Sequence, residues 1–246
     1  MPDSTNVILP AAQAFVSGTL EMPENITSGY IDNALAWSDF PVNTILVVIA
    51  TLLMFLSLRI FLNIGPLLLD SLSRWKACVN IDASVQLKGD RNTLARIITL
   101  PIALVADRYG FFTADILDNV PEGWSSPVTL GIILVWLLVK YLAFYLCLFQ
   151  APRPETFRTA HSSFFNYWTL AGILLVLTAG IIAFTGIQDE VGRTVLLYEL
   201  AVMYLIALLR KSQILLSYCG PLTTFLYLCA LELIPAALMV CAHLFF

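Results

Sequence analysis

The chain has 246 residues, of which 59% are hydrophobic and 12% are charged, against about 25% charged residues in a typical soluble domain. A soluble fold of this length could not bury so much apolar surface, because a large part of any folded surface faces water. The net charge of −4, with only 13 Lys and Arg residues and no basic stripe, argues against nucleic-acid binding. We therefore expect an all-α, polytopic membrane helix bundle that contacts membrane lipids.

The chain divides into a short polar segment and a long apolar region. Residues 1–40 are acidic and contain no Lys or Arg, so we expect an extracytoplasmic segment there. Residues 41–246 then form the transmembrane domain. Its first apolar run, residues 42–69, is long enough to cross about 30 Å of hydrocarbon. Residues 70–93 are polar, and we expect them to form an internal loop.

The second apolar segment, residues 94–112, is weaker because it is short and contains Pro101. Two readings compete: a short transmembrane span, and a re-entrant or interfacial helix. The charge distribution below favours the span. Later apolar segments are clearer and predict spans at residues 128–149, 164–184, 194–209 (extending to 216) and 221–246. The total is about six spans.

The distribution of basic residues predicts the topology. With six spans and an outer N-terminus, ten of the 13 Lys and Arg residues fall on the inner side, two on the outer side, and Lys140 within a span. Cytoplasmic loops of membrane proteins are rich in these residues. If residues 94–112 did not cross, most of the later basic residues would face outward. We expect a multi-pass protein of a bacterial inner membrane with both termini in the periplasm.

Three ionisable residues lie inside apolar spans, namely Lys140, Glu199 and Glu232. Each costs roughly 2.5–3.5 kcal/mol at the bilayer centre. Lys140 and Glu232 lie at matched depths of about 15 and 16–17 Å from the inner ends of their helices, which predicts an ion pair between them. The alternative is that Lys140 extends to the interface while Glu232 is protonated. For Glu199 we expect a hydroxyl group or a water as partner.

Pro235 follows Glu232 in the last span. Proline removes a backbone donor and leaves a carbonyl of the preceding turn without its helical partner. A bent helix beside a carboxylate could bind a cation, a proton or a polar partner. A simple packing kink at Pro235 is the favoured alternative, because proline is common in membrane helices.

Catalytic, metal-binding and cofactor-binding patterns are missing from the sequence. We therefore expect no cofactor and no enzymatic activity. His161, Arg153 and Arg158 lie together at an inner edge and are candidate contacts for anionic lipid headgroups. Ordinary enrichment of basic residues beside a span explains the two arginines equally well.

Several short segments resemble an uncharacterised Bacteroidota inner-membrane family, domain of unknown function 4271. The family's aromatic-rich signature YLCxLEIxP is matched at Tyr227, Leu228, Cys229, Leu231, Glu232 and Pro235, its aromatic-Asn element at Phe165, Asn166 and Gly172, and its mid-span lysine at Lys140. The resemblance covers roughly residues 42–246. Pro101 and Asp107 depart from it. It implies an inner-membrane protein of a diderm bacterium, adds Asn166 to the intramembrane polar residues, and supplies no activity.

The leading functional interpretation is a non-catalytic inner-membrane subunit that assembles with other envelope proteins, in a protein secretion or translocation machine. The polar segments 1–40 and 70–93 offer surface for such partners. One alternative is a small transporter or proton-coupled carrier that uses Lys140 and Glu232, which a cavity reaching Glu232 would favour. Another is an intramembrane enzyme acting on a lipid, which a lateral opening beside convergent polar groups would favour.

Overall fold

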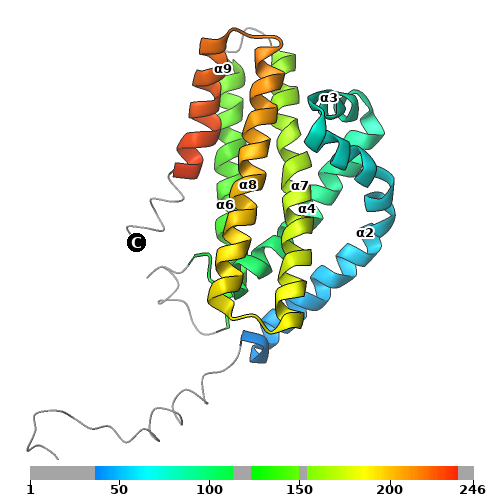
Figure 1. The fold of residues 1–246 in the computed structure, drawn as a ribbon, viewed down its shortest axis with the longest axis vertical. Helices are drawn as coiled ribbons and strands as arrows, with labels where there is room; N and C mark the ends of the chain where they lie inside the picture. The colour runs from blue at the N-terminus through cyan, green and yellow to red at the C-terminus, as the bar shows by residue number, and fades with distance from the viewer. Residues whose placement is uncertain (1–36, 113–122, 150–153, 238–246) are drawn as a thin grey trace, which may run out of the picture.

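A computed structural model describes residues 37–112, 123–149 and 154–237, and every regular element in these ranges is helical (Figure 1). The expected all-α class is confirmed for this part of the chain. Most of the acidic N-terminal segment, the acidic residues of the 113–122 stretch, Arg153 and the last nine residues lie outside the described ranges.

Four of the helices are long and apolar enough to cross a membrane, and the segment Pro221–Ala237 forms a shorter apolar helix. The chain is therefore built as a multi-pass membrane protein, while the count of six spans stays a prediction. The elements are η1 (Trp37–Asp39), α2 (Pro41–Ser73), α3 (Trp75–Ala83), α4 (Val85–Arg108), α6 (Ser125–Phe149), α7 (Pro154–Thr185), α8 (Asp189–Leu216), α9 (Pro221–Leu228) and η2 (Cys229–Leu233). The candidate spans are α2, α6, α7 and α8.

The expected polar loop at residues 70–93 is helical, so that prediction was wrong. Only Arg74 and Ser84 interrupt the helices there. The side chain of Ser84 accepts a hydrogen bond from the Leu87 backbone N–H and caps the start of α4, as serine does at many helix N-termini. Ile81 and Cys78 are completely buried, so α3 is an amphipathic helix that packs on the bundle rather than a solvated loop.

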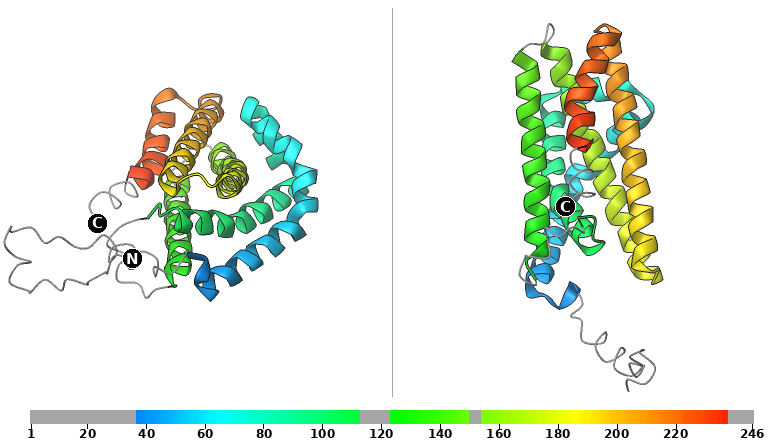
Figure 2. Two further views of the ribbon diagram at one scale, coloured as in Figure 1. Left: turned by 60° about the horizontal axis from the view of Figure 1, so that its bottom comes forward. Right: turned by 90° about the vertical axis from the view of Figure 1, so that its left-hand side faces the viewer.

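The helices run between two ends of the bundle. In Figures 1 and 2, α6, α7, α8 and α9 lie side by side, and α2 leans away from them. The helix α3 and the turn between α8 and α9 lie toward one end, called here the α3 end. The turn between α7 and α8 lies with η1 at the other end, called the η1 end.

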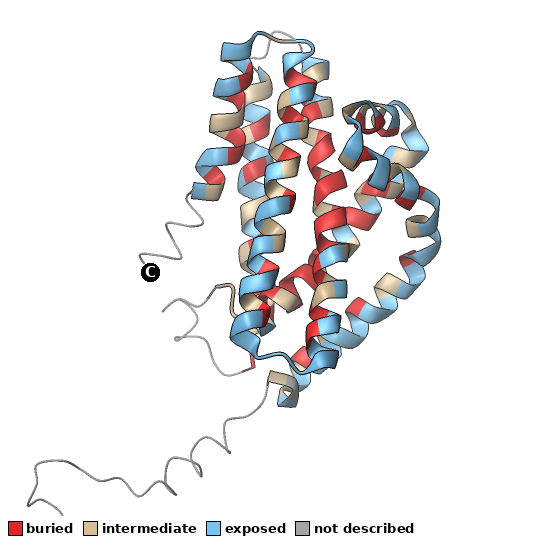
Figure 3. Cartoon of the chain, viewed as in Figure 1, coloured by how far each residue is buried: buried red, intermediate tan, exposed pale blue. Residues whose placement is uncertain are grey.

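Burial is concentrated on α7 and α4, as Figure 3 shows. In the most apolar stretch of α7, 39% of residues are buried, against 11% in α2. The faces of α2 and α6 expose large apolar side chains such as Phe55, Leu62 and Leu146. Such faces suit a lipid environment, where apolar side chains need no protein cover.

Candidate intramembrane charge site

One glutamate and two lysines from three helices meet inside the bundle. The Lys140 ammonium of α6 donates to Oε2 of Glu232 at 2.6 Å, and the Lys211 ammonium of α8 contacts Oε1 of the same carboxylate. All three side chains are buried. The contact between Lys140 and Glu232 that matched depth predicted is therefore present, and Lys211 turns the pair into a triad.

The directions of the helices explain why these side chains meet. A helical side chain leans toward the N-terminus of its own helix. The helices α6 and α8 end at the α3 end, so Lys140 and Lys211 lean away from that end and into the bundle. The chain runs the opposite way through α9 into η2, so Glu232 leans back toward the α3 end. The lysines and the carboxylate therefore approach one another from opposite sides.

Aromatic rings surround the two ammonium groups. The Phe164 ring of α7 lies 3.9 Å from Lys140 Nζ and 5.1 Å from Lys211 Nζ. The Trp136 ring lies 5.0 Å from Lys140 Nζ. The negative face of an aromatic ring attracts a cation, so these rings stabilise positive charge in a place with little water.

Lys211 is the site residue that the sequence interpretation missed, because it was taken only as one of the ten basic residues on the inner side. Its side chain is buried inside the bundle and only 1% exposed. The spacing of apolar residues along α8 could have predicted that Lys211 is buried. Met203, Ala207 and Lys211 recur every four residues and are all buried, so Lys211 continues the packed stripe of α8.

The carboxylate is carried by a local departure from α-helical geometry. Residues Cys229–Leu233 form one π-helical turn, in which the Ile234 N–H bonds to the carbonyl of Cys229. Helices depart from regular geometry near proline, and Pro235 follows directly. The Glu232 carbonyl accepts a hydrogen bond from the Tyr204 hydroxyl at 2.8 Å. A π-turn thus lies directly before Pro235, while the predicted kink at Pro235 itself stays a prediction.

Asn166 and Glu199 do not join the triad. Asn166 lies two positions after Phe164, which turns its side chain about 200° around the helix axis. It is completely buried, and neither polar atom of its amide has a partner in the described residues. Glu199 lies about 18 Å along α8 from Lys211. Its carboxylate interacts with the Thr178 side chain, the kind of partner expected for it, while Oε1 has no partner among the described residues.

The candidate lipid contacts at the start of α7 are also separated. His161 stacks on the Phe144 ring, with centroids 3.9 Å apart and planes at 10°. Arg158 is exposed, and Arg153 lies outside the described residues. His161 thus packs among aromatic side chains, and the proposed contact of all three with headgroups stays a prediction.

Two pockets adjoin the triad. The first, of about 170 Å³, lies between α6, α7 and α8, and Lys211, Glu232 and Trp136 are among its lining residues. The second, of about 300 Å³, lies between α6 and α7 and is lined in part by Lys140 and His161. Phe164 lines both pockets, and its ring lies 3.9 and 5.1 Å from the two ammonium nitrogens.

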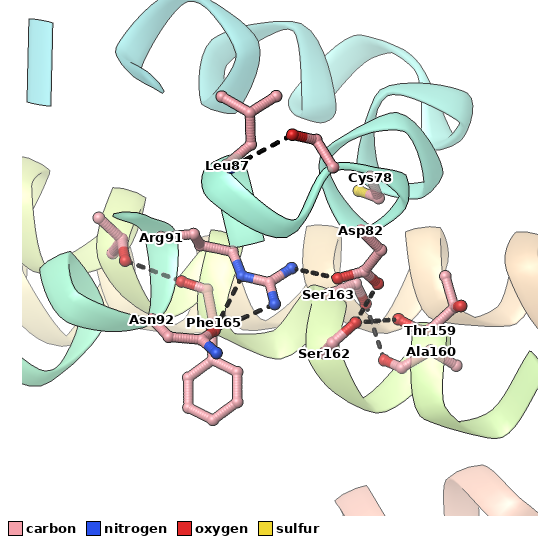
Figure 4. A network of polar contacts seen from close by, with 12 residues as sticks. Cys78, Asp82, Leu87, Arg91, Asn92, Thr159, Ala160, Ser162, Ser163 and Phe165 are labelled. Atoms are coloured by element: carbon pink, nitrogen blue, oxygen red, sulfur yellow. Dashed lines mark hydrogen bonds and ion pairs between the residues drawn. The ribbon is translucent and has the colours of Figure 1, made fainter. Parts of the chain in front are cut away.

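A second buried charge network lies near the α3 end (Figure 4). Arg91 of α4, which is completely buried, donates from Nη1 to Oδ1 of Asp82 at 2.8 Å. Its Nε and Nη2 donate to the Asn92 side chain, and the Ser162 hydroxyl of α7 donates to Oδ2 of Asp82. This network has one positive and one negative charge, so it joins α3, α4 and α7 without excess charge.

Comparison with known proteins adds no template for the triad. No family model, curated protein or solved structure gives a significant match to this chain.

Proposed function

We propose that the chain is a small proton-coupled carrier of a bacterial inner membrane, in which Lys140, Lys211 and Glu232 form the working site. The observation that carries the proposal is the convergence of three buried charges from three helices beside a pocket. Ionisable residues inside membrane bundles mark substrate paths, ion paths and proton relays. Membership of the Bacteroidota family, with both termini in the periplasm, is part of the same proposal and rests on the sequence resemblance and the charge distribution.

The charges of the site support proton coupling. Fully ionised, the triad carries one negative and two positive charges and is positive by one. Excess charge in a low-dielectric interior is costly. Release of one proton from either lysine makes the triad neutral, and uptake of that proton makes it positive again. A site poised between these two states can couple the movement of a proton to the binding of another solute.

A structural role alone explains the triad less well. Replacing a buried ion cluster by apolar residues of similar volume is often neutral or stabilising. Stability therefore gives no reason for a second lysine beside a carboxylate that already has a cation partner. The network of Arg91 and Asp82 shows how the same bundle joins helices with a neutral pair.

The carrier proposal is tested in proteoliposomes that enclose a pH-sensitive dye. Chloride, phosphate, lactate, succinate, sodium and glycine are added outside in turn, and the internal pH is followed against empty vesicles. We expect at least one solute to change the internal pH only when the protein is present, and Lys211→Met to abolish that change. Arg158→Met, an exposed substitution outside the triad, serves as the control. If no solute gives a response above that of empty vesicles, the proposal is wrong.

A second candidate is the assembly subunit, and one observation favours it. Arg74, Lys76 and Lys88 are exposed around α3 and form a basic surface suited to an acidic partner protein. Mild-detergent purification of the tagged protein with mass spectrometry of what comes with it tests this candidate. A stoichiometric partner that is lost on reversing these three charges would support it. If the partner still co-purifies after the three charges are reversed, the basic surface is excluded as the docking site.

A further inference from the structure

The chemistry of the first pocket indicates what it binds. Glu232 already uses both carboxylate oxygens, one for each lysine. In the described residues no second carboxylate pairs with Lys140 or Lys211. Lys211 lines this pocket, and its ammonium has three donor hydrogens. The triad beside the pocket therefore has more donors and more positive charge than Glu232 alone can accept.

The indole of Trp136 adds another donor in the same place. Trp136 lines the pocket, and its buried Nε1–H has no acceptor within the described chain. The other polar groups of the lining are engaged elsewhere. The Tyr167 hydroxyl donates to the Ser71 carbonyl, the Tyr204 hydroxyl donates to the Glu232 carbonyl, and the Trp168 N–H donates to Thr99. A buried donor without an acceptor is costly, and a bound acceptor group would remove that cost.

The rest of the pocket is apolar. Its remaining lining includes Ala171, Leu200, Met203, Ala207 and Leu208. The volume of about 170 Å³ compares with the roughly 150 Å³ of an apolar cavity that holds benzene. A small inorganic anion would leave most of this apolar space unfilled, and a dianion would replace the excess positive charge by an excess negative charge.

We propose that this pocket binds a small organic monocarboxylate, with its carboxylate toward Lys211 and the Trp136 N–H and its apolar body against Leu200 and Met203. That this ligand is also transported rests on the carrier proposal, which the inference deepens by naming the substrate class. Binding of one monoanion to the triad with both lysines protonated gives a neutral site. The empty site is neutral when one lysine has lost its proton. Monocarboxylate and proton therefore enter and leave together.

Binding is tested by isothermal titration of the detergent-purified full-length protein with benzoate, which is ionised at pH 7. Benzamide has nearly the same shape without the charge, and phosphate has charge without the apolar body. We expect saturable binding of benzoate and at least tenfold weaker binding of the other two. Equal binding of benzamide would show an apolar pocket without charge recognition, and equal binding of phosphate would show an inorganic anion site. Either result overturns the inference.

Two tryptophans give a matched pair of variants. Trp136→Phe removes the unpaired N–H and keeps an aromatic ring, so one hydrogen bond to the charged ligand is lost. We expect benzoate affinity to fall about tenfold, which corresponds to about 1.4 kcal/mol. Trp168→Phe alters the same lining but removes an N–H that is already bonded to Thr99, so affinity should change less than threefold. Equal losses in the two variants would contradict a specific role of Trp136.

Lys211→Met separates this inference from the carrier proposal. It leaves the neutral pair of Lys140 and Glu232, so the variant should fold, and we expect it to lose benzoate binding. Absence of benzoate binding to the wild-type protein overturns the substrate class, while proton-coupled flux of another solute would leave the carrier proposal standing. Benzoate binding without any flux in proteoliposomes would keep the binding site and remove the carrier proposal.

Discussion

At the scale of single residues, Glu232 differs from the two lysines that it contacts. It is the only acid in the triad, so both ammonium groups depend on it. Loss of either lysine leaves one positive and one negative charge in contact. Loss of the glutamate charge leaves two buried ammonium groups without their counter-ion, beside the rings of Phe164 and Trp136. The three substitutions should therefore have unequal effects.

We predict that Glu232→Gln destabilises the protein by about 3–5 kcal/mol, the usual effect of leaving a buried charge without its partner. Lys140→Met and Lys211→Met should each cost much less, because a neutral pair remains. Thermal unfolding of the purified variants in the same detergent gives the comparison. Addition of Lys140→Met to Glu232→Gln should restore only part of the stability, since Lys211 stays unpaired. Equal loss in all three single variants would contradict the asymmetry.

The same triad shows what the sequence could and could not reveal. Depth along two helices permitted contact between Lys140 and Glu232, because rise per residue is nearly constant in a helix, but only the fold shows that the two helices meet. Lys211 lies only about 7.5 Å from the end of α8, where a lysine normally reaches the interface. Its burial depends on α7 and on the short α9 and η2 segment, which pack beside the end of α8. Sequence position alone does not contain that tertiary information.

Asp107 is a second residue whose surroundings decide its role. Its carboxylate accepts hydrogen bonds from the Trp37 indole at 2.7 Å, from the Ser125 and Thr129 hydroxyls at 3.1 and 3.2 Å, and from Ser126. These donors come from η1 and α6, so Asp107 joins three elements at the η1 end. The resemblance marked Asp107 as a departure in the second span, and here it is the acceptor that holds the ends of α4 and α6 together.

We predict that Asp107→Ala costs about 1–3 kcal/mol or more, because several donors lose their shared acceptor at once. Asp70→Ala is the control, since the Asp70 side chain is 47% exposed and its only ion pair within the described residues is a 4.0 Å contact with Arg74. An exposed pair of this kind contributes about 0–1 kcal/mol. Parallel thermal unfolding measures both variants. Equal stability of the two variants would show that the Asp107 cluster contributes little.

At the scale of elements, the close approach of α4 and α7 depends on one glycine. A Cβ atom at Gly172 would lie 2.5 Å from Ile98 Cγ1 and 2.7 Å from Ile102 Cδ1. Small residues allow membrane helices to pack this closely. Gly172 belongs to the segment that resembles the Bacteroidota family, and its packing gives a physical reason for a glycine there.

We predict that Gly172→Val destabilises the protein by about 1–3 kcal/mol, because the added methyl groups force α4 and α7 apart. Gly180 lies on the same helix, and a Cβ there meets no atom within 4 Å. Gly180→Val therefore loses the same backbone freedom without overpacking and should stay close to the wild type. The yield of monodisperse protein and its unfolding temperature measure both effects. Comparable losses would rule out a specific contact at Gly172.

The helices also show which structural features the hydropathy pattern does not predict. Long apolar runs predicted the existence of α2, α6, α7 and α8, because twenty apolar residues have few alternatives in a membrane protein. The bounds were less accurate, since α7 begins at Pro154, ten residues before the predicted span. The polar residues 70–93 suggested a loop, because polarity was taken to indicate solvent exposure. In the fold, Arg91 and Asp82 neutralise each other, so polar residues can belong to packed helices. Which charges pair across helices is set by tertiary contacts.

At the scale of the whole molecule, the direction of α4 decides the topology. Its 24 residues rise about 36 Å, which exceeds the roughly 30 Å of a bilayer core. The first half is polar and begins beside α3, and its last turn meets η1 through Asp107 and Trp37. The two ends of α4 therefore lie toward the two ends of the bundle, as the predicted second span requires. Because α4 is not among the four helices long and apolar enough to be candidate spans, its crossing stays a prediction.

We predict that Lys88 and Arg108, both exposed on α4, face opposite sides of the membrane. In a cysteine-free background, Arg108→Cys should react with a membrane-impermeant maleimide in cells with a permeabilised outer membrane. Lys88→Cys should react only after the inner membrane is opened, because the basic residues around α3 belong on the cytoplasmic side. Lys76→Cys, on the neighbouring helix α3, is the control and should behave as Lys88→Cys does. Labelling of positions 88 and 108 from the same side would show that α4 does not cross, and the sides assigned to all later helices would then be reversed.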